Sequence, residues 1–109
     1  MTRSLLQRRL VDVSDRLKRL RADLAVADEQ CAFLEAEAED ARLRALVSET
    51  PLAEAEAHET RRHADAQNRQ RDSLRRSIGE LEQEQDALLD RMAAELSASP
   101  GNPAPGRSS

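Results

Sequence analysis

Histidine, cysteine and carboxylate side chains are the groups of this chain that could carry out chemistry. The two histidines, His58 and His63, are five residues apart and do not share one face of a helix. Glu54 and His58 do share a face, at a spacing of four residues, but two ligands rarely hold a metal ion. The single cysteine, Cys31, has no partner for an internal disulfide. We therefore expect no catalytic residue, no metal and no cofactor, and a protein that is not an enzyme.

Two heptad patterns of apolar residues, which we call the seams, predict that these groups lie on long helices. In each seam the spacing alternates between four and three residues, which is typical of a coiled coil. The first seam consists of Leu6, Leu10, Val13, Leu17, Leu20, Leu24, Ala27, Cys31, Leu34, Ala38, Ala41 and Ala45. The second consists of Ala53, Ala57, Thr60, Ala64, Gln67, Arg71, Leu74, Ile78, Leu81, Gln85, Leu88 and Met92. The seams predict one helix over about 4–47 and another over about 51–97.

The junction between the two seams predicts a turn over about 48–50. Thr50 can cap a helix, and Pro51 suits the first helical position because its missing N–H is not needed there. From residue 98 onward proline, glycine and serine dominate, so we expect a disordered tail over 98–109. Residues 1–97 would then form one domain.

Composition and charge predict an all-α fold in which two long helices form an antiparallel coiled-coil hairpin. Hydrophobic residues make up 39% and aromatic residues 1% of the chain, which favours long helices over a globular core. If residue i of the first helix faces residue 98 − i of the second, the two seams meet along their whole length. Residues 1–21 carry seven basic and two acidic side chains, and the facing residues 77–97 carry one basic and six acidic. Residues 22–37 and 61–76 are complementary in the opposite sense, so we interpret the basic stretches as internal charge partners.

Polar residues interrupt the second seam at Gln67, Arg71 and Gln85. Polar residues in a seam lower stability but fix register or oligomeric state. Alternatively, these three residues line a groove for a partner.

A further apolar stripe, which we call the outer stripe, lies on the side of the first helix opposite its seam. It consists of Ala22, Ala25, Val26, Ala32, Phe33, Ala36, Leu43, Leu46 and Val47. A continuous exposed apolar stripe favours contact with another helix. We therefore expect a homodimer that forms a four-helix assembly, with Val26, Phe33, Leu43 and Val47 in its interface.

The residues around the turn, 38–60, form an acidic tip with six acidic and two basic side chains. Its segment "PLAEAEAHE", residues 51–59, resembles the "DLxENAEYH" region that follows the turn in Gre-type transcript cleavage factors. The resemblance implies a helical hairpin that inserts an acidic tip into the secondary channel of RNA polymerase. It maps Glu54 onto the acidic tip residue of the family and His58 onto its histidine. We expect the tip residues Glu49, Glu54, Glu56 and His58 to bind a partner.

These features favour a non-enzymatic coiled-coil protein-interaction module, such as a scaffold, an adaptor or a regulatory subunit, with a protein partner of unknown identity. A Gre-like hairpin is the first alternative; a helical arm that binds nucleic acid or a secretion-type chaperone is the second. The net charge of −4 argues against nucleic acid. No apolar run reaches the roughly 20 residues that span a membrane. The lone cysteine and the lack of a signal-peptide pattern favour the cytoplasm.

Overall fold

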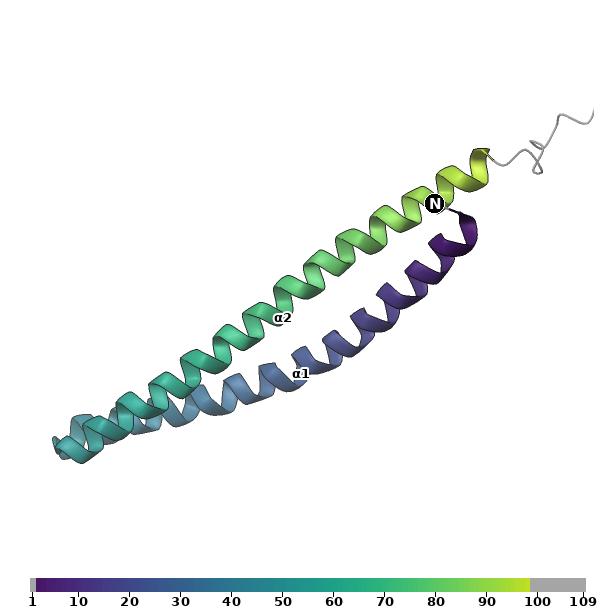
Figure 1. Cartoon of the computed structure of the whole chain (residues 1–109). Coiled ribbons are helices and arrows are strands. Elements are labelled where there is room, and N and C mark those ends of the chain that lie inside the picture. The colour runs from purple at the N-terminus through teal and green to yellow at the C-terminus, as the bar shows by residue number, and fades with distance from the viewer. Residues whose placement is uncertain (1, 99–109) are drawn as a thin grey trace, which may run out of the picture. The chain divides into compact units, whose positions relative to one another are not determined.

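The structure, a computed structural model, describes residues 2–98, and they form two long helices joined by a short turn. Helix α1 spans Arg3–Ser48 and helix α2 spans Pro51–Ala98 (Figure 1). Ser48 is therefore the last residue of α1 rather than part of the turn, and Ala98 is the last residue of α2. The rest of the predicted tail, residues 99–109, lies outside the described residues.

The turn consists of two residues, Glu49 and Thr50, and each has a distinct local role. The Thr50 hydroxyl accepts a hydrogen bond from the backbone N–H of Ala53 at 3.2 Å, which confirms the predicted cap. Glu49 has a φ of 52°, in the left-handed region that ends many helices. Its N–H still donates to the carbonyl of Ala45 at 3.0 Å. The chain therefore reverses at one left-handed residue followed directly by a capped helix.

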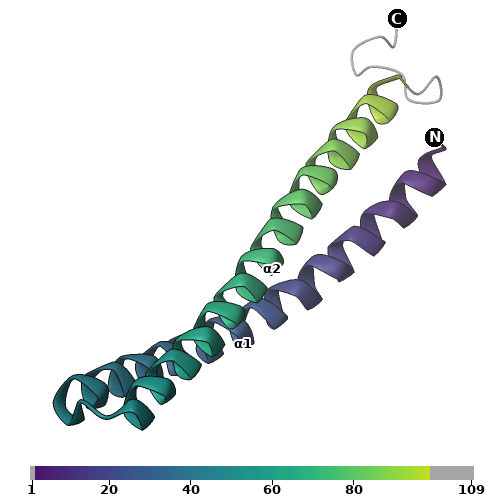
Figure 2. The same cartoon turned by 60° about the vertical axis from the view of Figure 1, so that its left-hand side comes forward.

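Residues 19–78 form one compact part of the chain, which we call the turn-proximal part. Here α1 and α2 run antiparallel and lie side by side next to the turn, as Figures 1 and 2 show. The core consists mainly of small side chains: Ala27, Cys31, Ala38, Ala41, Ala64 and Ile78. Small residues in both seams allow two helices to approach closely, because they leave little side-chain volume between the backbones.

The second compact part, the terminal part, consists of the described residues 2–18 and 79–98. Its core is made of larger side chains: Leu6, Val13, Leu17, Leu81 and Leu88. Leu6 and Leu17 are each only 1% exposed, so this part is held together chiefly by burial of leucine. A hydrogen bond of 3.1 Å from the Gln85 amide to the Ser14 hydroxyl also joins the two helices here.

Burial follows both predicted seams closely. Every seam residue of α1 and α2 is buried or half-buried. Three polar pairs between the helices, Glu35 with Arg61, Gln30 with Gln67 and Ser14 with Gln85, lie within two residues of the predicted pairing of i with 98 − i. The antiparallel register predicted from the heptads is therefore the register of the structure.

Candidate functional site

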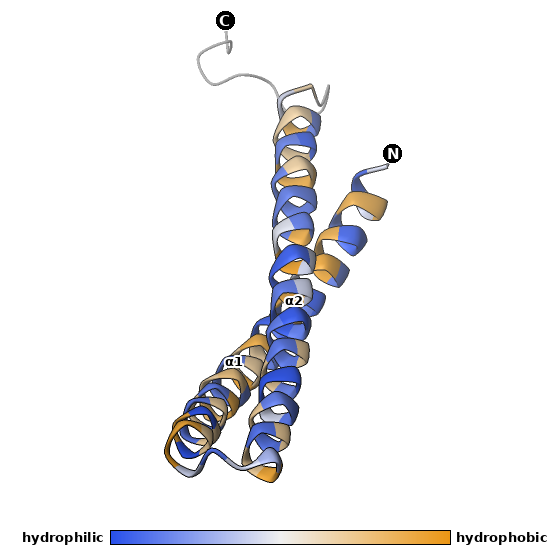
Figure 3. Cartoon of the chain, turned by 90° about the vertical axis from the view of Figure 1, so that its left-hand side faces the viewer, coloured by the Kyte–Doolittle hydropathy of each residue, from blue (hydrophilic) through white to orange (hydrophobic). Residues whose placement is uncertain are grey.

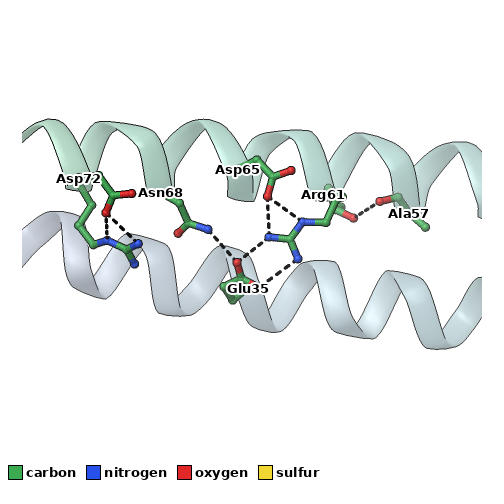
Figure 4. A network of polar contacts seen from close by, with 8 residues as sticks. Glu35, Ala57, Arg61, Asp65, Asn68 and Asp72 are labelled. Carbon is green, nitrogen blue, oxygen red and sulfur yellow. Dashed lines mark hydrogen bonds and ion pairs between the residues drawn. The ribbon is translucent and has the colours of Figure 1, made fainter.

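A network of polar side chains crosses between the helices on one side of the turn-proximal part. The Arg61 guanidinium donates to both carboxylate oxygens of Glu35, with Nη2–Oε1 at 2.6 Å and Nη1–Oε2 at 3.1 Å. Its Nε donates to Asp65 on the same helix at 3.0 Å, and the Asn68 amide donates to Glu35 at 2.9 Å (Figure 4). The hydrogen bond from Arg61 is the main cause that lowers the pKa of Glu35 to about 2, and the bond from Asn68 lowers it further. This network joins α1 to α2 within the turn-proximal part.

Ion pairs between the helices follow the predicted complementary charge blocks. Arg75 pairs with Asp28 at 3.5 Å in the turn-proximal part, and Arg9 pairs with Glu84 in the terminal part. These contacts confirm that side chains of the basic stretches pair with facing acidic side chains. In each pair at least one of the two side chains is more than a third exposed. Each pair therefore contributes little to stability, about 0–1 kcal/mol.

On the other side of the turn-proximal part, two neighbouring shallow depressions lie between the helices. Asp28 and Glu35 each follow a seam residue by one position, whereas Asp23 and Gln30 each precede one, so the two sets flank opposite sides of the seam. The larger depression, of about 420 Å³, is lined by Glu29, Gln30, Phe33, Leu34 and Gln67. The smaller, of about 290 Å³, is lined by Asp23, Val26, Ala27, Gln30, Gln67, Gln70 and Leu74.

A hydrogen bond between two glutamines lies between these depressions. The Gln67 amide donates to Gln30 Oε1 at 2.9 Å, so this polar seam residue has a partner on the facing helix. Gln67 could be singled out from the sequence, because a polar residue at a seam position can line a groove. Gln30 and Leu34 carried no such signal, since nothing in their spacing shows that the helices leave a hollow beside them.

The outer stripe is exposed along its whole length. Its predicted interface residues are 54% exposed for Val26, 63% for Phe33, 47% for Leu43 and 86% for Val47. The alanines of the stripe and Leu46 are exposed as well. Figure 3 shows hydrophobic residues gathered on α1 next to the turn, whereas the part of α2 beside them is mostly hydrophilic. Val26 and Phe33 also line the two depressions, so the outer stripe adjoins this side of the hairpin.

At the tip, some charged residues are paired and others are not. Arg42 bonds to Glu39 at 2.7 Å, and Arg62 and His63 both contact Glu59. The hydrogen bond from Arg42 lowers the pKa of Glu39, and the bond from Arg62 lowers the pKa of Glu59.

The predicted tip residues Glu49, Glu54, Glu56 and His58 are all exposed, and within residues 2–98 they make no side-chain ion pair. A depression of about 410 Å³ includes one of them, Glu56, and is lined by Leu43, Arg44, Val47, Ser48, Ala53 and Glu56. The structure therefore brings the unpaired carboxylate of Glu56 next to Leu43 and Val47 of the outer stripe.

The cysteine, histidine and carboxylate side chains do not gather into one cluster within residues 2–98. Cys31 is buried in the core, 3% exposed, where it packs as a small apolar side chain. Among the described residues, no three histidine, cysteine, aspartate or glutamate side chains lie close enough to hold a metal ion. Neither α1 nor α2, as far as residues 2–98 extend, has a stretch apolar enough to cross a membrane.

Comparisons with known proteins do not place the chain in a family. No protein-family model matches it, and neither the curated proteins nor the solved structures yield a match.

Proposed function

We propose that this chain is a non-enzymatic coiled-coil interaction module that works in the cytoplasm. Its hairpin forms a homodimer through the outer stripe, giving a four-helix assembly, and presents its acidic tip to a protein partner. The observation that carries this proposal is the exposure of Phe33, 63%, in the middle of an apolar stripe. Soluble chains seldom leave a continuous apolar surface in water, and such surfaces mark sites of protein contact.

The contrast between the two faces of α1 supports the proposal. The seam residues of α1 are buried or half-buried against α2, whereas every residue of the outer stripe is exposed. Burying one phenylalanine contributes about 1.5–3 kcal/mol. A second helix that covered Phe33 together with Val26 and Leu43 would therefore gain several kcal/mol to offset the entropy lost on association.

Replacing Phe33 by aspartate tests the dimer directly. Phe33→Asp should weaken self-association at least tenfold in analytical ultracentrifugation, because a charge would be buried where an aromatic ring was. Val11→Asp is the matched control, since Val11 is 58% exposed on the same helix but lies outside the stripe. Circular dichroism should show that both variants keep their helices. Equal association constants for the two variants would contradict the assignment of the interface.

The unpaired carboxylates at the tip favour a second candidate function, a Gre-like hairpin that acts on RNA polymerase. Glu54 lies in the first turn of α2, directly after the reversal of the chain, which is where the resemblance to Gre-type factors maps the acidic tip residue. Pro51 stands where that family has an acidic residue, so Glu54 would supply the charge without that neighbour. Carboxylates are also favoured at the start of a helix by its dipole, which is a structural reason for Glu54.

Binding to purified RNA polymerase distinguishes the two candidates. A Gre-like hairpin should bind the core enzyme, and Glu54→Lys with Glu56→Lys should abolish that binding while leaving self-association unchanged. The matched control reverses Glu39, which is exposed on α1 and already paired with Arg42. An interaction module with another partner should not bind polymerase in either form. Its own tip-dependent binding should weaken as salt is raised, since exposed charges are screened within about 10 Å at 0.1 M ionic strength.

A further inference from the structure

We propose that two copies of this chain pair antiparallel along the outer stripe, with residue i of one α1 facing residue 69 − i of the other. This inference deepens the proposed homodimer and rests on it, because it names the register and the contacts of the second copy. The residues involved, 22–47, all lie within the turn-proximal part.

The spacing of the stripe is self-complementary in this register. Six stripe residues, at positions 22, 26, 33, 36, 43 and 47, alternate by four and three residues once the acidic positions 29 and 40 are included, and together they form a heptad pattern. When i faces 69 − i, Ala22 meets Val47 of the second copy and Val26 meets Leu43. Phe33 meets Ala36, so the largest side chain of the stripe lies opposite a small one. Each contact occurs twice, as a two-fold axis requires.

Charge complementarity supports the second copy as the occupant. Asp23 and Arg44 each follow an interface position by one residue, as Glu35 and Arg61 each follow a seam position in the hairpin. In the hairpin, Glu35 faces position 63 but pairs with Arg61, two residues before that position. Asp23 would face position 46 of the second copy, so the same offset of two residues places it beside Arg44 of that copy. Neither side chain has an ion pair within residues 2–98, so both are available for this contact.

One pair of positions opposes the association. Glu29 would face Asp40 of the second copy, and both are exposed acidic residues. Like charges at facing positions destabilise a helix pair. The register therefore makes an unusual prediction: removing this repulsion should strengthen the dimer, whereas most interface substitutions weaken it.

Disulfide crosslinking tests the orientation of the two copies. In a Cys31→Ser background, a chain carrying Val26→Cys is mixed with a chain carrying Leu43→Cys and oxidised. We expect a disulfide between the two different chains, and none when either single variant is oxidised alone. Residues 26 and 43 of one helix are about 26 Å apart, too far for a disulfide within a chain. Crosslinking of a single variant with itself would indicate parallel helices and overturn the proposal.

Charge exchange tests the register by sedimentation equilibrium. Asp23→Arg and Arg44→Asp should each weaken the dimer about tenfold, because each converts two attractive contacts into repulsive ones. The double variant should recover to within about threefold of the unsubstituted chain. Glu29→Lys should tighten the dimer, since it places a lysine opposite Asp40. Failure of the double variant to recover, or a weaker Glu29→Lys dimer, would refute the register.

The failure of this inference can be told apart from the failure of the proposed homodimer. If Phe33→Asp abolishes association but the crosslinks and charge exchange do not follow the register, the dimer stands and the register is wrong. If the unsubstituted chain sediments as a monomer at all concentrations, the homodimer and the register are both wrong, and the stripe binds a different protein.

Discussion

The left-handed residue at the turn permits a sharp test of how the hairpin closes. Glu49 has a φ of 52°, a conformation that costs a residue with a Cβ about 1–2 kcal/mol. Glycine adopts it without that cost, but it loses more conformational entropy on folding, about 0.5–1 kcal/mol. Glu49→Gly should therefore increase the free energy of unfolding by about 0.5–1 kcal/mol. This gain would come from a residue that is exposed and whose side chain makes no hydrogen bond or ion pair within residues 2–98.

Glu49→Ala is the matched control for this prediction. Both substitutions remove a carboxylate from the C-terminal end of α1, where the helix dipole disfavours negative charge. Only glycine removes the Cβ, so the difference between the two variants isolates the backbone conformation. The assay is urea unfolding followed by circular dichroism at one protein concentration, because association couples to unfolding. Equal stabilities of the glycine and alanine variants would refute the reasoning, as would a glycine variant that is less stable.

Three further predictions concern the body of the hairpin. Gly79→Ala should stabilise the chain by about 0.5–1 kcal/mol in the same urea assay, because Gly79 lies inside α2 and nothing is within 4 Å of an added Cβ; a loss of stability would show that the two helices must approach closely there. Leu17→Ala should destabilise by about 2–5 kcal/mol, since Leu17 is 1% exposed, whereas Leu5→Ala, at a residue 48% exposed, should cost much less; similar effects would argue against a core at Leu17. The bond from Arg61 holds the pKa of Glu35 at about 2 in the folded chain, below the ordinary value of 4.5, so the stability that Glu35 contributes is present above pH 4.5 and is lost as the pH falls through about 2. The stability difference between the unsubstituted chain and Glu35→Gln should therefore shrink between pH 5 and pH 2, and a difference that stays constant over this range would contradict the pairing.

Much of the fold could be predicted from the residues because the decisive information is periodic. A seam residue such as Leu17 or Ala38 recurs at heptad spacing, and every residue of that set is buried or half-buried in the structure. Thr50 and Pro51 predicted the start of α2 for a similar reason, since capping depends on neighbours within one helical turn. The end of α1 was less clear, because Glu49 takes a left-handed conformation that is uncommon for glutamate.

The candidate site was only partly predictable. The outer stripe and the acidic tip could be located from spacing and charge, and Phe33 and Glu54 are exposed as expected. The sequence did not allow a prediction of which side of the hairpin carries the depressions. That depends on how deeply side chains such as Gln30 and Gln67 fill the space between two helices, which no single helix determines.

By itself, the sequence determined the two helices, their antiparallel register and the faces that they bury. The heptad spacing and the charge blocks both favour this same pairing along the length of the two helices. The tertiary structure alone decided which polar groups meet. Arg61 could have paired with Asp65 on its own helix only, but in the structure it also bridges to Glu35 on α1, and Asn68 joins it there. A long arginine side chain reaches several carboxylates at similar cost, so its partner is set by the distance and rotation between packed helices and not by spacing along one of them.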